Sequence, residues 1–82
     1  MKTLLIIDDN VNFADDLEMM LNSSYRILKA DTSLMGLEIL KRQHVSVVLL
    51  DLKLPDIPGL EVLEIIRSEY DNSLPVIIDT IS

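Results

Sequence analysis

The sequence predicts an α/β fold with a parallel sheet, contained in a single domain. Short apolar runs alternate along the chain with segments in which apolar residues recur every three or four positions. The resulting order, β-α-β-α-β-α-β, is typical of a parallel sheet whose helices make right-handed crossovers. A length of 82 residues limits the chain to one domain.

The first unit is a strand over residues 3–7 followed by a helix over residues 11–22. The strand is a continuous apolar run that ends at Asp8 and Asp9. The helix has an apolar stripe at helical spacing, formed by Phe13, Ala14, Leu17, Met20 and Leu21. We therefore expect this helix to pack against the sheet through that stripe.

The second unit is a strand over residues 25–30 and a helix that extends to about Gln43. Asp31 or Thr32 can cap the start of this helix, because both side chains accept hydrogen bonds from the first turn. Its apolar stripe consists of Leu34, Leu37 and Leu40. Gly36 weakens the helix by roughly 1 kcal/mol relative to alanine.

The third unit begins with a strand over residues 45–50 that is apolar on both faces and is therefore expected at the centre of the sheet. A loop with two prolines follows over residues 51–58, and Pro58 suits the first position of a helix. That helix has a stripe of Leu60, Leu63 and Ile66. A turn over residues 71–73 leads to a fourth strand over residues 75–80.

Composition excludes several classes of function. Fourteen acidic and seven basic residues give a net charge of −7, which opposes binding to a nucleic-acid backbone. No apolar run approaches the roughly 20 residues that span a bilayer, and the first run is too short for a signal peptide. The absence of cysteine excludes disulfides and zinc–thiolate sites. We therefore expect a cytoplasmic protein that binds neither membranes nor nucleic acid through this segment.

Three aspartates follow apolar runs directly: Asp8 and Asp9 after the first, and Asp51 after the third. If the two runs are neighbouring parallel strands, the three carboxylates meet at the carboxyl edge of the sheet, where α/β proteins bind ligands. Carboxylates this close repel one another unless a cation lies among them, and hard oxygen ligands suit Mg²⁺. The structural alternative is that Asp8 and Asp9 cap the following helix and Asp51 is a turn residue.

Four segments, in this order and spacing, resemble the receiver domain of two-component response regulators: residues 4–10 (LLIIDDN), 47–56 (VVLLDLKLPD), 59–61 (GLE) and 74–80 (LPVIIDT). The resemblance covers essentially the whole chain. It implies a flavodoxin-like fold with strand order 2-1-3-4 and three helices. It also implies a role in phosphorelay signal transduction.

The resemblance assigns a role to each residue of the site. Asp51 corresponds to the phosphoacceptor, Asp9 to a direct Mg²⁺ ligand and Asp8 to an outer-shell acid that positions metal-bound water. The backbone carbonyl of Lys53 completes the metal ligands, and Thr80 corresponds to the switch hydroxyl that contacts the phosphoryl group. Aspartate side chains suit this chemistry, since a carboxylate attacks phosphorus in line while Mg²⁺ neutralises the phosphoryl charge. A domain of this kind is a signalling module, with self-catalysed phosphotransfer at most, and not an enzyme.

The implied partners are a sensor histidine kinase or a histidine phosphotransfer protein, with an output domain beyond residue 82. The sequence also departs from the family, which has a fifth strand, two further helices and a lysine after that strand. We therefore expect residues 1–82 to form a truncated receiver domain whose exposed fourth strand drives dimerisation or rearrangement. Asp79 stands where the family has an apolar residue, and it either lies at this edge or joins the acidic cluster.

Other functions fit the residues less well. A receiver-like interaction module that is not phosphorylated is the main alternative, and the missing lysine favours it. An aspartate-nucleophile phosphatase would need a second aspartate at position 53, where this chain has Lys53. A dinucleotide site would need a glycine-rich turn after the first strand, and the chain has only Gly36 and Gly59. His44 is interpreted as a solvated residue at a helix end, and Asp56 as a turn former.

Overall fold

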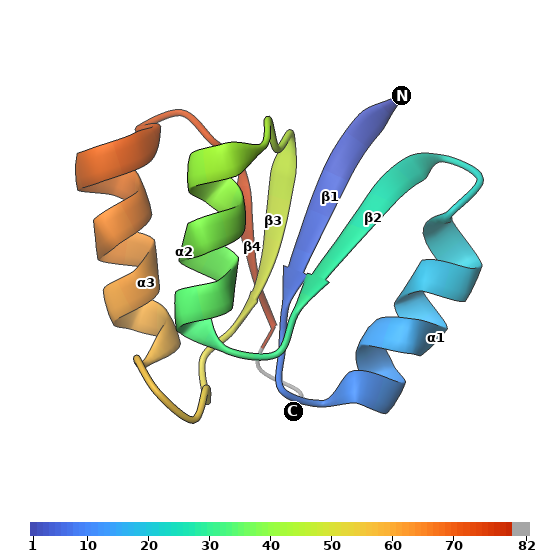
Figure 1. Cartoon of the computed structure of the whole chain (residues 1–82), viewed down its shortest axis with the longest axis horizontal. Helices are drawn as coiled ribbons and strands as arrows, with labels where there is room; N and C mark the ends of the chain where they lie inside the picture. Colours follow the sequence, from blue (N-terminus) through green and yellow to red (C-terminus); the bar gives the residue numbers. More distant parts are fainter. Residues whose placement is uncertain (80–82) are drawn as a thin grey trace.

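The computed structural model describes residues 1–79 of the chain. It contains one sheet of four parallel strands in the order β2-β1-β3-β4, flanked by helices (Figure 1). The elements are β1 Lys2–Ile7, α1 Val11–Leu21, β2 Tyr25–Ala30, α2 Ser33–Arg42, β3 Val47–Asp51, α3 Gly59–Ile65, the π-helical turn η1 Ile66–Tyr70, and β4 Val76–Asp79. The predicted strand order and the three predicted helices are confirmed.

The two central strands are β1 and β3, and both are apolar on both faces. Leu5, Ile6 and Ile7 of β1 are completely buried, as are Val48 and Leu50 of β3. A strand covered on both sides must be apolar at successive positions, which is why these runs do not alternate with polar residues. The core therefore holds β1 and β3 in place, and with them the residues that follow each strand.

The helices form two unequal layers (Figure 1). The α1 helix packs alone on one face, where Ala14 joins Leu4 and Ile6 of β1 in a small core. The α2 and α3 helices lie side by side on the other face, where Leu37 and Val62 pack on a larger core. Each crossover returns the chain to a parallel strand, so every strand ends at the same edge of the sheet.

Several boundaries differ from the predicted ones by one or two residues. The β3 strand begins at Val47, two residues later than expected, and it includes Asp51. Pro58 was expected inside the third helix but lies at its N-cap with an extended ψ of 142°. Thr32, one of the two predicted caps, accepts a hydrogen bond from the Met35 N–H at 3.1 Å. The predicted switch residue, Thr80, lies outside the described residues.

The prediction for Met20 is wrong. This residue was assigned to the buried stripe of α1, but 74% of it is exposed, and its neighbour Met19 is 78% exposed. A single helix crossing a sheet face contacts it through a narrow stripe, and Ala14 is the buried residue of α1. No helix in residues 1–79 combines the length and the apolar character needed to cross a bilayer.

Gly36 has a packing role that offsets its poor helix propensity. It is buried in α2, where its missing side chain leaves room for Ile7 of β1. A Cβ at this position would lie 2.5 Å from Ile7 Cδ1 and 2.9 Å from Ile7 Cγ1, closer than van der Waals contact. Glycine therefore allows α2 to approach the central strand, and an alanine would force the Ile7 side chain to shift.

Candidate functional site

The structure brings Asp8, Asp9 and Asp51 together at the carboxyl edge of the sheet. Ile7 and Leu50 are paired residues of β1 and β3, so the residues that follow them come next to each other. Each of the three aspartates offers a carboxylate oxygen, and these oxygens lie within 4.8 Å of one another. Asp8 and Asp51 are only 3% and 1% exposed, whereas Asp9 is exposed.

In each of the two buried carboxylates, Asp8 and Asp51, one oxygen accepts a backbone hydrogen bond and the other accepts none. Asp8 Oδ1 accepts a hydrogen bond from the Asn10 N–H at 2.8 Å, and Asp51 Oδ1 accepts one from the Lys53 N–H at 3.1 Å. The Oδ2 atoms of Asp8 and Asp51 are buried without a hydrogen-bond partner. A buried anionic oxygen is costly unless a donor or a cation meets it. The residues present therefore fit a hard divalent cation.

A fourth carboxylate joins this cluster from β4. Asp79 is the register partner of Asp51, and it is 6% exposed. The sequence left open whether Asp79 lies at the exposed edge of the sheet or joins the acidic cluster, and in the structure it joins the cluster. The pKa of Asp8 is raised from its ordinary value of 3.8 to about 6, chiefly by burial, with smaller contributions from the charge of Asp51 and from Asp79 that are partly offset by the Asn10 N–H.

The loop after Asp51 is fixed to the start of α2 by Asp56. Its carboxylate accepts hydrogen bonds from the Ser33 and Leu34 N–H groups, both at 2.9 Å, and Ser33 Oγ donates to the Ile57 carbonyl at 2.6 Å. Partial desolvation opposes ionisation of Asp56, but the N–H donors outweigh it and lower its pKa to about 2. The sequence predicted only a turn former here. The structure adds a second role, a cap on α2 that anchors the site loop.

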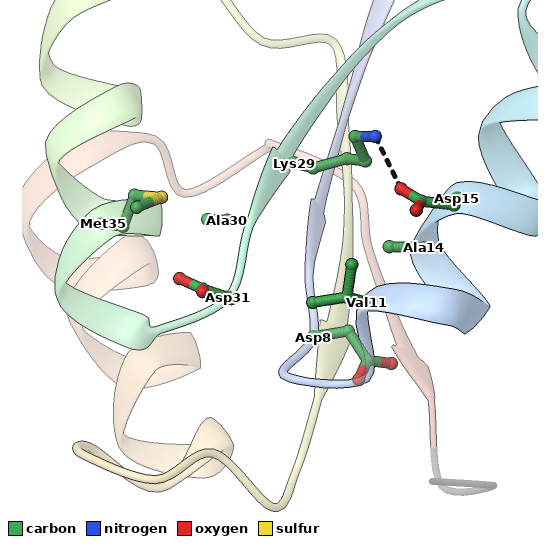
Figure 2. A pocket seen from close by; sticks show the side chains of 8 residues that line it. All are labelled: Asp8, Val11, Ala14, Asp15, Lys29, Ala30, Asp31 and Met35. Atoms are coloured by element: carbon green, nitrogen blue, oxygen red, sulfur yellow. Dashed lines mark hydrogen bonds and ion pairs between the residues drawn. The ribbon is translucent and has the colours of Figure 1, made fainter.

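Lys29, near the end of the neighbouring strand β2, is paired away from the aspartate cluster. Its Nζ forms ion pairs with Asp15 at 2.8 Å and Glu18 at 2.7 Å on α1. Figure 2 shows the Lys29–Asp15 pair at the rim of a small cavity of about 220 Å³ lined by residues of α1, β2 and α2. Asp8 borders the same cavity, whereas the Lys29 ammonium points to α1. Lys29 therefore does not neutralise the aspartate cluster.

A family model described as the response regulator receiver domain matches residues 4–82. The chain belongs to this family. It is therefore a receiver domain, a signalling domain of phosphorelay systems, as its sequence predicted. Receiver domains bind Mg²⁺ through acidic residues, and the aspartate cluster lies where such a site is expected.

Individual relatives agree with this assignment. The cell cycle response regulator CtrA of Brucella ovis is 40% identical over 68 residues, which cover 82% of this chain and 29% of the relative. The hydrogenase transcriptional regulatory protein HoxA of Cupriavidus necator is 30% identical over 76 residues, 93% of this chain and 16% of the relative. The chain thus spans less than a third of the length of these curated relatives.

Solved structures agree on the architecture. The N-terminal domain of a response regulator receiver protein from Methanoculleus marisnigri superposes with a TM-score of 0.92 at 30% identity. The comparison covers 100% of this chain and 68% of that one. The flavodoxin-like receiver fold predicted from the sequence is confirmed.

Two other predicted residues of the receiver domain are placed as follows. Lys53 is exposed in the loop after β3, and its backbone N–H contacts Asp51, while the ligand role of its carbonyl stays a prediction. His44 is exposed and precedes β3, so it lies toward the opposite edge of the sheet from the aspartates. That position agrees with a solvated histidine.

Gly59 gives a direct test of the packing beneath Asp51 of the receiver domain. A Cβ on Gly59 would collide with the Asp51 carbonyl oxygen and lie 2.7 Å from Leu52 Cα. Because both contacts are backbone atoms, they cannot rotate away. Gly59→Ala is expected to destabilise the fold by roughly 1–3 kcal/mol and to displace Asp51. Urea unfolding and magnesium titration of this variant check both effects, and a variant as stable as the parent would contradict the close approach.

Proposed function

We propose that Asp51 of this receiver domain accepts a phosphoryl group from a phosphohistidine, with Mg²⁺ held by Asp8, Asp9 and Asp51. One observation supports this function above the others: three carboxylates meet at the end of the sheet, and two of their oxygens are buried without partners. Such an arrangement is unfavourable for an empty, purely structural site. It suits a site that binds a cation and handles a phosphoryl group.

The transfer forms one bond and breaks one. An Asp51 carboxylate oxygen attacks the phosphorus, the P–O bond forms, and the P–N bond to the donor histidine breaks. The histidine nitrogen leaves with the electron pair and takes up a proton, and Asp51 becomes an acyl phosphate. Mg²⁺, when bound, neutralises charge on the carboxylates and on the phosphoryl oxygens. Asp51 is 1% exposed, so the donor phosphoryl group has to reach a carboxylate that lies within the protein.

The remaining roles follow the family pattern. Asp9 is exposed at the edge and would contact the cation directly, while Asp8 would hold metal-bound water. The carbonyl of Lys53 would complete the protein ligands, because its N–H already places this peptide beside Asp51. Thr80 would hydrogen-bond the phosphoryl group and report phosphorylation to the surface. For Thr80 the support is sequence alone.

Family membership also supports the partners. The donor would be a sensor histidine kinase or a histidine phosphotransfer protein in the cytoplasm, and an output domain would follow residue 82. A truncated domain over residues 1–82 and pairing of two copies along β4 stay predictions. The other predicted function, an interaction module that is not phosphorylated, is not favoured, since it gives no reason to keep buried carboxylates together.

The proposal is tested by mass spectrometry of the intact chain. We expect incubation with acetyl phosphate and Mg²⁺ to add the mass of one phosphoryl group, because Asp51 is the single acceptor. Adding a chelator should prevent the gain. If the folded chain gains no mass with acetyl phosphate and Mg²⁺, under conditions in which a known receiver domain does, the proposed function is wrong for this chain.

A further inference from the structure

Asp79 is built into the sheet beside the phosphoacceptor. Paired residues of adjacent parallel strands point to the same side, and strands lie about 4.8 Å apart. Asp79 of β4 and Asp51 of β3 are such a pair. Asp79 is 6% exposed, so its carboxyl group is held within the protein and not in solvent.

The Asp79 carboxyl group also lies near Asp8, which follows β1, the strand on the other side of β3. The two carboxyl groups are close enough to share a hydrogen bond when one of them is protonated, and the charge of Asp79 acts on Asp8. In the strand order β1-β3-β4, Asp8 and Asp79 therefore approach each other across Asp51. Four aspartates are gathered in one place, counting Asp9 at the edge.

A purely structural role does not explain this arrangement. An apolar side chain of similar size would fill the Asp79 position without adding charge to a cluster that already contains Asp8, Asp9 and Asp51. The buried Oδ2 atoms of Asp8 and Asp51, which have no hydrogen-bond partner, point independently to a ligand. A fourth negative charge is unfavourable in the empty cluster and favourable when a divalent cation is present.

We infer that Asp79 is a positioning residue of the cation site, which acts through Asp8 and strengthens binding of divalent cations. The oxygens that lie within 4.8 Å of one another belong to Asp8, Asp9 and Asp51, so Asp79 lies beside this ligand group and is not part of it. From there it orients the Asp8 carboxylate and adds negative potential at the cation. Residues that support metal ligands in this way typically change affinity strongly when they are removed. The inference rests on the proposed function, because it requires a cation held by these three aspartates.

The test measures binding of the metal alone. Isothermal titration calorimetry with Mg²⁺ and electron paramagnetic resonance with Mn²⁺ would compare the parent chain with Asp79→Asn, which keeps the shape and removes the charge. We expect affinity to fall about 10- to 100-fold. Asp79→Leu should show the same loss, and Asp79→Glu should recover part of the affinity. Asp16→Asn, which removes one charge from an exposed position on α1, should leave affinity within about twofold of the parent because solvent screens it.

A second readout separates positioning from structure. Without metal, Asp79→Asn should melt at a higher temperature than the parent, because repulsion in the cluster is relieved. With saturating Mg²⁺, its gain in melting temperature should be smaller than that of the parent. Equal cation affinity in the parent, Asp79→Asn and Asp79→Leu would overturn the inference while leaving the proposed function intact. Absence of cation binding by the folded parent chain would overturn both.

Discussion

Replacement of Asp51 by asparagine is expected to abolish phosphoryl incorporation by this chain. The amide is almost the same size as the carboxylate and can keep the Lys53 N–H hydrogen bond to Oδ1. It is not a nucleophile toward phosphorus, and it removes one of three charges that would attract a cation. We therefore expect a loss of at least about 100-fold in the phosphorylated fraction, measured by intact mass after incubation with acetyl phosphate and Mg²⁺.

Asp31→Asn is the matched control for Asp51→Asn. Asp31 also follows a strand directly, since β2 ends at Ala30, but it is exposed and lies outside the aspartate cluster. This variant should be phosphorylated like the parent. Thermal unfolding of the metal-free chains gives a second comparison, because Asp51→Asn should raise the melting temperature by relieving repulsion and Asp31→Asn should not. Full phosphorylation of Asp51→Asn would show that another residue is the acceptor.

The stability of the metal-free chain is expected to fall as pH rises from about 4 to 6. Asp8 has a pKa of about 6 in the folded chain and 3.8 ordinarily. Below pH 3.8 the group is protonated in both states, and its contribution to stability is fully present. As pH rises, the unfolded chain releases the proton first, so folding becomes less favourable until pH passes the folded pKa. A difference of about two pKa units corresponds to about 3 kcal/mol.

Other carboxylates act in a different pH window. Asp56 and Asp71 have pKa values below their ordinary value of 3.8. Their contributions to the stability of the fold are therefore present above pH 3.8 and are lost as the pH falls below it. The metal-free chain should therefore be most stable near pH 4, where neither loss applies. Bound Mg²⁺ should remove the decline above this pH, because the cation favours ionised Asp8.

Urea unfolding at intervals between pH 4 and pH 7, with and without Mg²⁺, measures this effect. Asp8→Asn is the matched variant, and its free energy of unfolding should change much less over the same range. Metal-free stability that is constant or increases between pH 4 and pH 6 would contradict the burial of an ionisable Asp8 among like charges.

The convergence of Asp8, Asp9 and Asp51 could be predicted from sequence because it depends on local signals and topology. Each apolar run ends in aspartate, and a parallel sheet with helical crossovers places all strand ends at one edge. The strand order followed from the resemblance to the receiver family. These features survive small errors in element boundaries, such as the late start of β3 at Val47.

The interactions that sequence did not predict depend on contacts between distant segments. Asp56 caps α2 through N–H groups that are 23 and 22 positions away, and no local pattern marks such a cap. Asp79 could lie at an edge or in the cluster, and only its register with Asp51 decides between them. Met20 satisfied the helical spacing, but periodicity does not state how wide a stripe a neighbouring sheet covers.

Calorimetric titration of the metal-free chain with Mg²⁺ tests most directly whether the clustered aspartates form a cation site. We predict that one Mg²⁺ binds per folded chain and that Asp9→Asn, a change at an exposed position, removes most of this binding while the chain stays folded. A folded parent chain that takes up no Mg²⁺, or an Asp9→Asn variant that binds it as tightly as the parent, would contradict this account of the site.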